Sequence, residues 1–464
     1  MLPKCPTGIR GLDELTGGGL PKGRSTLVCG DAGAGKTLFG LEFLVNGARL
    51  YDEPGVFLGF DESQEELAAN CESLGFQLQE LIADGKIVIH HVAVERNEIE
   101  ETGGYDLAGL FIRLGHAIDS IKAKRVALDT IDALIPGFEN ELILRAEIRR
   151  LFRWFKAKGV TAVVTSESGM ETLTRYGLQE YHADCILLLD RRSTGPMVTR
   201  RLRIVKYRGA AHALDEHSFL IDETGFFVVP TAVNVPDREV STERVSTGIA
   251  DLDVMLEGEG YFRGSTIVIS GASGTGKTGF AAHFADALCR NGETALFCSL
   301  AESEGQLIRD VRSMGIDLEP WVKQGRLRFS VSRAVGAWFE LHLAAYYRLV
   351  EEYKPTAVIF DPISGLAAMG SSVHVAAMLT GLMDFLKANR ITAVFTDLSP
   401  GYFSVEPASA ALTPLMDTWI SLHFLESGDE LVRGVHVVKS KGMAHSSAMR
   451  TFRFTDKGIQ FFEM

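Results

Sequence analysis

Two short stretches of this chain place glycines, a lysine and a threonine at the same spacing. They read GDAGAGKT at 30–37 and GASGTGKT at 271–278. In this pattern glycines let successive backbone N–H groups face phosphate oxygens, the lysine reaches the terminal phosphates, and the last hydroxyl ligates Mg²⁺. The sequence therefore predicts two sites for ATP with Mg²⁺. We expect these sites to be lined by Gly30, Gly33, Gly35, Lys36 and Thr37 in the first copy, and by Gly271, Gly274, Thr275, Gly276, Lys277 and Thr278 in the second.

Carboxylates end two apolar runs where such sites need a second metal ligand. Asp129 ends the run RVALD and Asp361 ends the run AVIFD, each as the first charge after a buried strand. A carboxylate at this place holds Mg²⁺ together with the cradle hydroxyl, Thr37 or Thr278. The alternative is that each aspartate only caps the next helix.

A water that attacks the terminal phosphate needs an orienting carboxylate. Asp61 and Glu62 follow the strand-like run GVFLGF, and the second copy has Ala301 and Glu302 at the same places. We predict that Asp61, Glu62 and Glu302 are catalytic beside the cradle lysine Lys36. The alternative is that the acids cap a helix, because DESQEEL is typical of a helix start.

The whole chain is a tandem repeat. The offset between matching segments is about 230 to 240 residues throughout, which suits one α/β domain per copy. Prolines and charges replace apolar periodicity at 228–245, so we place the domains at 1–232 and 240–464. The matching segments are TGIRGLDEL (7–15) with TGIADLDVM (247–255), RVALDTIDAL (125–134) with AVIFDPISGL (357–366), and RIVKYRGAAH (203–212) with HVVKSKGMAH (436–445).

Short β-branched runs alternate with helix-length amphipathic stretches within each copy. The runs STLVCG, GVFLGF, RVALDT and VTAVVTSE are nearly all apolar, which is typical of parallel strands covered on both faces. The last runs of each copy read as antiparallel hairpins. We therefore predict an α/β fold, with a mainly parallel wound sheet closed by C-terminal hairpins in each copy.

The composition argues against several functional classes. The 464 residues carry a formal net charge of −13, which disfavours nucleic acid as a main partner because a duplex needs a positive surface. No apolar run approaches the roughly 20 residues of a membrane span, and the first residues lack a secretory pattern. The six cysteines have no metal-like spacing. We expect a cytoplasmic protein without a membrane partner.

Further motifs resemble the KaiC family, the duplicated RecA-type ATPases known from the cyanobacterial circadian clock. They are GGGLPKG at 17–23, GGYDLAGL at 103–110, TRYGLQE at 174–180 and KYRGAAH at 206–212. The resemblance covers essentially the whole chain and implies two tandem RecA-like P-loop NTPase domains. Family members form homohexamers of two stacked rings with ATP between subunits. Their N-terminal ring hydrolyses ATP slowly, and their C-terminal ring is an autokinase and phosphatase.

The KYRG element adds cations to the predicted site. A lysine and an arginine two apart on a strand project to one face, so Lys206 and Arg208 could both reach a phosphate. The resemblance assigns them to a neighbour's γ-phosphate, with Arg208 as an arginine finger and His212 nearby. The alternative is a surface strand with solvated charges. The second copy offers Lys439 and Lys441 at these places.

The second copy departs from the family at functional positions. It has Ala301 where the family has the first of two glutamates, and Lys441 where the family has an arginine finger. A lysine cannot make the planar bidentate contact of arginine. The family's Ser–Thr phosphoacceptor pair corresponds to Thr413 and Pro414, which leaves Thr413 as a candidate acceptor or as part of a turn. We expect a second site that binds ATP and turns it over poorly.

Three functions compete at this point. The first is a hexameric KaiC-like ATPase, a clock- or stress-type switch assembled by ATP. The second is a Ser/Thr autokinase that phosphorylates Thr413. The third is a RecA- or RadA-like DNA-dependent ATPase, which the acidic charge disfavours; a non-enzymatic scaffold is a weaker fourth. Because the chain stops at DKGIQFFEM, we expect no control by KaiA, whereas GGYDLAGL leaves a KaiB-like partner open.

Overall fold

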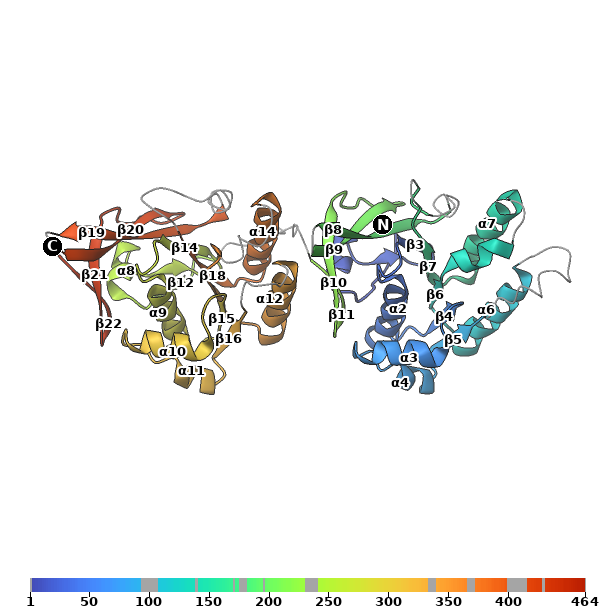
Figure 1. Cartoon of the computed structure of the whole chain (residues 1–464), viewed down its shortest axis with the longest axis horizontal. Helices are drawn as coiled ribbons and strands as arrows, with labels where there is room; N and C mark the ends of the chain where they lie inside the picture. The colour runs from blue at the N-terminus through green and yellow to red at the C-terminus, as the bar shows by residue number, and fades with distance from the viewer. Residues whose placement is uncertain are drawn as a thin grey trace. The chain divides into compact units, whose positions relative to one another are not determined.

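The computed structural model describes most of the chain in two compact units, Met1–Pro230 and Thr231–Met464 (Figure 1). Thr413 and Pro414 lie outside the described residues, as do 103–106 and 175–180 of the two motifs quoted above. The described residues are 2–92, 107–137, 141–169, 172–174, 182–194, 197–229, 241–332, 339–364, 372–398, 415–427 and 430–463.

The first unit is built on a nine-stranded sheet. Its elements are β1 (Lys4–Cys5), α1 (Leu12–Leu15), β2 (Leu20–Pro21), β3 (Ser25–Gly30), α2 (Lys36–Leu50), β4 (Gly55–Gly59), α3 (Gln64–Glu72), α4 (Leu78–Ala83), β5 (Ile87–His91), α6 (Ala108–Ile121), β6 (Arg125–Asp129), η1 (Ile131–Gly137), α7 (Glu141–Lys158), β7 (Thr161–Glu167), β8 (Cys185–Thr194), β9 (Met197–Tyr207), β10 (Glu216–Asp222) and β11 (Gly225–Val228). The sheet order is β11-β10-β9-β8-β3-β7-β6-β4-β5. The strands from β8 to β5 are parallel, and β9, β10 and β11 continue the sheet in antiparallel pairs.

The second unit repeats this arrangement. Its elements are β12 (Arg244–Val245), α8 (Ala250–Met255), β13 (Tyr261–Phe262), β14 (Thr266–Gly271), α9 (Lys277–Arg290), β15 (Ala295–Ser299), α10 (Glu304–Arg312), α11 (Glu319–Lys323), β16 (Leu327–Val331), α12 (Phe339–Tyr353), β17 (Ala357–Asp361), α14 (Ser372–Ala388), β18 (Thr392–Leu398), β19 (Thr418–Ser427), β20 (Glu430–Ser440), β21 (Arg450–Thr455) and β22 (Gly458–Phe462). The order β16-β15-β17-β18-β14-β19-β20-β21-β22 matches the first sheet strand for strand. The predicted fold class, two wound α/β sheets with C-terminal hairpins, is confirmed.

Helices cover both faces of the first sheet because its strands are apolar on both faces. Along β3, Val28 joins the buried cluster under α2, whereas Leu27 joins the separate cluster under α6 and α7. This alternation is the period of two expected for a strand. The sheet therefore has a packed core on each side, and its functional groups must emerge at the strand ends.

A fully buried arginine fastens the start of β6. Arg125 is 0% exposed, and its guanidinium donates to Glu53 Oε2 at 2.8 Å and to the carbonyls of Phe43 at 2.9 Å and Pro6 at 2.8 Å. Gly47 leaves room for this side chain, because a Cβ there would lie 2.4 Å from Arg125 Cδ. The buried charge is thus paired and hydrogen-bonded, as burial of a charge requires.

The last strand of the first sheet has its outward amides capped. N–H groups alternate sides along an antiparallel strand, so Phe226 and Val228 of β11 direct theirs away from β10. Phe226 donates to Glu42 Oε2 on α2 at 2.7 Å, and Val228 donates to the carbonyl of Arg10 at 2.9 Å. The described edge of β11 is closed by these two acceptors.

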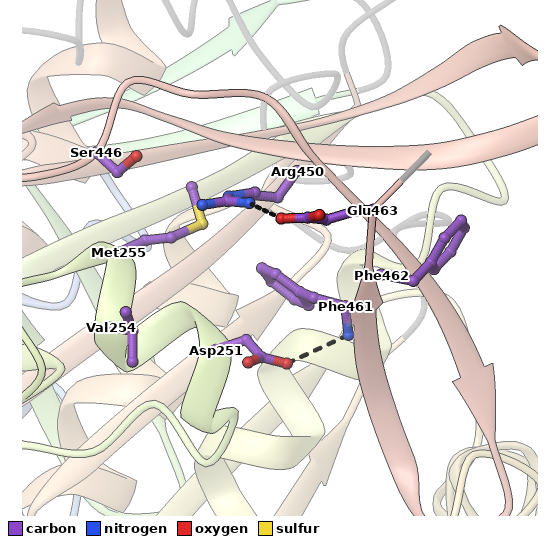
Figure 2. A pocket seen from close by; sticks show the side chains of 8 residues that line it. All are labelled: Asp251, Val254, Met255, Ser446, Arg450, Phe461, Phe462 and Glu463. Atoms are coloured by element: carbon purple, nitrogen blue, oxygen red, sulfur yellow. Dashed lines mark hydrogen bonds and ion pairs between the residues drawn. The ribbon is translucent and has the colours of Figure 1, made fainter.

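The second sheet closes the same edge with different acceptors. Ile459 of β22 donates to His283 Nε2 at 3.2 Å, and Phe461 donates to Asp251 Oδ2 at 3.3 Å. Figure 2 shows the second contact, with Asp251 of α8 facing the end of β22 at the side of a pocket of about 370 Å³. His283 occupies the position in α9 that Glu42 occupies in α2, so an imidazole and a carboxyl perform the same task.

Candidate nucleotide sites

The first phosphate cradle lies where the sequence predicts it, between β3 and α2. Gly33 and Gly35 have φ angles of 73° and 103°, a left-handed region that favours glycine. A Cβ at Gly35 would also lie 2.9 Å from the ring of Phe226 in the last hairpin. The loop therefore needs glycine at these two positions, because of its backbone angles and, at Gly35, because of the hairpin beside it.

The lysine and the threonine of this cradle face the mouth of the loop. Lys36 Nζ donates to the carbonyls of Gly30 at 2.8 Å and Asp31 at 2.9 Å. Thr37 Oγ1 donates to Asp129 Oδ2 at 2.6 Å. The hydroxyl and the carboxylate meet, so the two predicted metal ligands of the first copy are side by side.

Asp129 receives a second hydroxyl that the motif does not include. Thr165, near the end of β7, donates to Asp129 Oδ1. Burial raises the pKa of Asp129, while the hydrogen bonds from Thr165 and Thr37 act in the opposite direction. Hydroxyl and carboxylate oxygens are the ligands that Mg²⁺ prefers, so these residues fit a Mg²⁺ ion bound with a nucleotide.

The second cradle repeats this geometry between β14 and α9. Lys277 Nζ donates to the carbonyls of Gly271 and Ala272, both at 2.8 Å. Gly276 has a φ of 109°, and a Cβ there would lie 2.3 Å from the ring of Phe454. Thr275 closes the loop from within by donating to the carbonyl of Ala272 at 2.8 Å. Gly274 also has a positive φ, of 81°.

Asp361 corresponds to Asp129 in position and in partners. It is 7% exposed and accepts from Thr396. Burial raises its pKa, against hydrogen bonds from Thr396 and Thr278. The second copy therefore keeps a complete set of residues for binding Mg²⁺ and phosphate.

Asp61 and Glu62 precede the cap of α3. The cap is Ser63, which forms a capping box with Glu66, so capping does not occupy Asp61 or Glu62. Glu62 is partly buried, and burial followed by the charge of Asp129 raises its pKa. Glu62 therefore lies near Asp129, the predicted metal ligand, and Asp61 is the more exposed of the pair.

Glu302 has the same relation to the second site. Ser303 and Gln306 form the capping box of α10. Burial and then the charge of Asp361 raise the pKa of Glu302. The second copy therefore retains one carboxyl near Asp361, its predicted metal ligand, and has Ala301 in place of the other.

The sequence predicts that Lys206 and Arg208 share one strand, and this prediction is wrong. The strand β9 ends at Tyr207, and Arg208 begins the following turn. Arg208 N donates to the carbonyl of Asp184 at 2.8 Å, and Arg208 Nη1 lies 4.0 Å from Asp184 Oδ1. Both cations nevertheless act on His182, whose pKa is lowered first by burial and then by nearby cations, including these two. His212 is hydrogen-bonded to the carbonyl of Ala213 at 3.0 Å.

The end of β9 is remote from the cradle of the same domain. Tyr207 pairs with Cys185, at the start of β8, whereas Gly30 pairs with Leu189, further along the same strand. Four residues of strand span about 13 Å. Lys206 and Arg208 therefore lie beyond the reach of a nucleotide in the cradle of their own domain.

The second copy places lysines at the corresponding end of β20. Lys441 Nζ lies 3.9 Å from Asp417 Oδ1, and Lys387 Nζ lies 2.8 Å from Asp417 Oδ2. Burial and then the charge of Lys441 lower the pKa of Lys439. Asp184 in the first copy is instead paired with Arg24 at 3.1 Å and lies 4.0 Å from Arg208, so the two copies share only the last of these contacts, with a lysine in place of the arginine.

Sequence reasoning missed two arginines that lie against the cradles. Arg191 on β8 approaches the first loop, since its Nη1 would lie 3.4 Å from a Cβ at Gly33. Arg433 on β20 donates to the carbonyl of Gly274 at 3.2 Å. No motif marks either residue, and only the register of β8 beside β3 and of β20 beside β19 could have indicated them.

The fold and these two sites define a tandem RecA-like P-loop ATPase. The family model "ATPase: KaiC" matches residues 5–233 and again residues 245–464. The chain therefore belongs to the KaiC family, as the sequence motifs predict. In the part of the chain that the structure describes, no helix combines the length and the apolar surface needed to cross a bilayer.

Three curated relatives show how far the similarity extends. The circadian clock protein KaiC2 of Synechocystis sp. is 47% identical over 464 residues, which are 100% of this chain and 82% of that protein. The circadian clock oscillator protein KaiC of Synechococcus elongatus is 34% identical over 98% of this chain and 88% of its own length. The KaiC protein of Prochlorococcus marinus is 34% identical over 98% of this chain and 92% of its own.

Proposed function

We propose that this protein is a slow ATPase that works as a ring of copies, hexameric as the family resemblance implies. The first domain, 1–232, would hydrolyse ATP, and the second, 240–464, would chiefly hold it. The observation that carries the proposal is the position of Lys206 and Arg208, remote from their own cradle. Contacts of a front surface with a different back surface generate rings, so each copy would complete its neighbour's site.

The first domain would supply the groups that ATP hydrolysis needs, one of them to a neighbouring copy. Lys36, Thr37 and Asp129 would hold ATP with Mg²⁺, which when bound offsets phosphate charge. Glu62, with its raised pKa, suits acceptance of a proton from the attacking water. Arg208 of a neighbouring copy would stabilise the charge of the transferred phosphoryl group.

The second domain would bind ATP in the same way, but it lacks two groups that would raise the rate of hydrolysis. Lys441 replaces an arginine finger, which is worth about 10³ to 10⁵ in rate, and Ala301 removes one carboxyl of a pair. A general base contributes about 10² to 10⁴, part of which Glu302 retains. The expected result is ATP that stays bound and stabilises the ring, in the manner of a regulatory switch.

Steady-state hydrolysis by single-site variants tests this division. Lys36→Ala should abolish turnover, and Lys277→Ala should spare turnover while weakening assembly measured by light scattering. Lys86→Ala is the matched control, because Lys86 is a half-exposed surface lysine paired with Asp52. Loss of turnover from an intact ring of Lys277→Ala would contradict the proposal.

Mixed rings test whether the site is shared. Lys36→Ala has an intact finger and Arg208→Ala has an intact cradle, so each alone should be inactive. In an equal mixture about one interface in four joins an intact cradle to an intact finger. We expect roughly a quarter of the wild-type rate after mixing, whereas a site formed within one chain would give none.

A further inference from the structure

His182 lies among four cations that come from distant parts of the first domain. Lys206 belongs to β9, Arg208 follows it, and Arg149 and Arg153 belong to α7. Arg208 N donates to the carbonyl of Asp184, and Asp184 N donates to the carbonyl of Ser25 at the start of β3. The helix α7 ends at Lys158, just before β7 begins beside Ser25, so it ends on the side of the sheet where Arg208 lies. The pKa of His182 is lowered by burial and then by the charges of these four residues. The residues Arg149, Arg153, His182, Lys206 and Arg208 are called the cationic cluster below.

Arg149 and Arg153 contribute nothing evident to the stability of their own domain. They are four residues apart on α7 and both exposed, so they are neighbours of like charge on one helix face. Neither has an ion pair within the described ranges of the chain. Arg150, between them, is paired with Glu147 at 3.3 Å. The unpaired charges therefore fit a role toward a partner.

The second domain lacks this feature. Thr380 and Asp384 stand where the first domain has Arg149 and Arg153, and Leu415 stands in place of His182. Lys439 and Lys441 remain there, so the two domains share the finger position but differ in the surface beside it. The domain with the arginines is thus the one proposed to hydrolyse ATP, and the domain without them is the one proposed chiefly to keep ATP bound.

An acidic surface lies beside the cradle of the first domain, where the parallel strands of the sheet end. Asp61, Glu62, Glu65 and Glu66 follow β4 in the segment that enters α3. The parallel strands β3 and β4 both have their C-terminal ends on this side of the sheet. The cationic cluster lies on the opposite side, where β3 begins. The nucleotide phosphates would add further negative charge to the acidic side.

We propose that Arg149 and Arg153 bind the nucleotide-bearing face of a second copy, at its phosphates and the acidic segment 61–66. The inference rests on the proposed function, in which Arg208 acts on a neighbour. The two charges complement an acidic surface, and the two surfaces lie at opposite ends of the parallel strands of one sheet. Copies joined in this way follow one another head to tail, as a ring requires. Arg149 and Arg153 are thus binding residues of the shared site.

The test compares the double variant Arg149→Ala/Arg153→Ala with the control Arg150→Ala in the full chain. Light scattering gives the ATP concentration for half-maximal assembly, and steady-state kinetics give KM and kcat. Two exposed ion pairs of about 0.7 kcal/mol each amount to about 1.4 kcal/mol, which is a factor of ten, so the double variant should need about tenfold more ATP. Its assembly should also depend less on salt between about 50 and 300 mM, since exposed pairs are screened. Arg150→Ala should match the wild type.

Two results would overturn the inference. If the double variant assembles like Arg150→Ala while Arg208→Ala loses turnover, the shared site stands and the role of Arg149 and Arg153 falls. If Arg208→Ala also keeps full turnover, the proposed function falls as well. A transplant gives an independent measurement: Thr380→Arg/Asp384→Arg should tighten ATP-dependent assembly of the Lys36→Ala chain, and no tightening would count against the inference.

Discussion

Replacement of Glu42 by glutamine should stabilise the first domain, with a gain that grows as the pH rises. Glu42 is 4% exposed, and its Oε2 accepts the N–H of Phe226 at 2.7 Å. Burial raises the pKa of its carboxyl from the ordinary 4.5 to about 8, although the bond from Phe226 and the charge of Arg10 lower it and Asp222 raises it. The carboxyl is therefore mostly protonated in the folded domain at neutral pH.

The raised pKa fixes both the sign and the size of the effect. Between pH 4.5 and about 8 the unfolded chain carries an ionised Glu42 and the folded domain a protonated one. Stability then falls by about 1.4 kcal/mol per pH unit as pH rises. The loss is about 2 kcal/mol at pH 6, about 3 kcal/mol at pH 7 and about 4 kcal/mol at pH 8. Glutamine keeps the acceptor oxygen and cannot ionise, so Glu42→Gln should recover these amounts.

Hydrogen exchange measured by mass spectrometry reads this effect locally. Peptides spanning β10 and β11 should show an opening free energy that exceeds the wild-type value by about 2 kcal/mol at pH 6 and about 4 kcal/mol at pH 8. Peptides from β21 and β22 serve as an internal control, because that hairpin is capped by His283. A gain that is equal at both pH values would refute the reasoning.

Three further perturbations follow from buried or crowded groups. Burial lowers the pKa of His283 below its ordinary 6.5, so the β21–β22 hairpin should lose protection as pH falls below 6.5, and His283→Gln should remove that loss in the same exchange experiment. Arg125→Met leaves Glu53 without its buried partner and should cost about 3 to 5 kcal/mol, with partial recovery in Arg125→Met/Glu53→Gln by thermal unfolding. Gly276→Ala, with its 2.3 Å clash, should weaken nucleotide binding by the second domain at least tenfold in a fluorescent-nucleotide titration, whereas Gly305→Ala, with nothing within 4 Å, should not.

The sequence predicted those parts of the fold that depend on local pattern. Glycines, lysine and threonine stand next to one another in the cradle, so their geometry follows from a few consecutive residues. Asp129 and Asp361 were predictable because a charge after an apolar run marks the end of a buried strand. The duplication gave an independent check, since each helix or strand predicted in one copy also had to fit the matching segment of the other copy.

Residues that approach one another through packing were not predictable in this way. Arg191 reaches the first cradle only because β8 lies beside β3 in a particular register. Arg149 belongs to α7, which packs on β3 and β7, and no spacing in the sequence reveals that packing. Arg208 was expected on a strand, but a register shift opposite Ile186 and Leu187 and the end of β9 at Tyr207 place it in a turn.

The capped edges of β11 and β22 restrict how copies of this protein can join. An uncapped outer strand would allow two sheets to fuse through backbone hydrogen bonds, and such a junction is indifferent to nucleotide and difficult to reverse. With Phe226, Val228, Ile459 and Phe461 already donating within their own domains, that route is closed at the hairpin edges. Copies that associate at β11 or β22 must therefore do so through side chains, and side-chain contacts can change when a nucleotide binds.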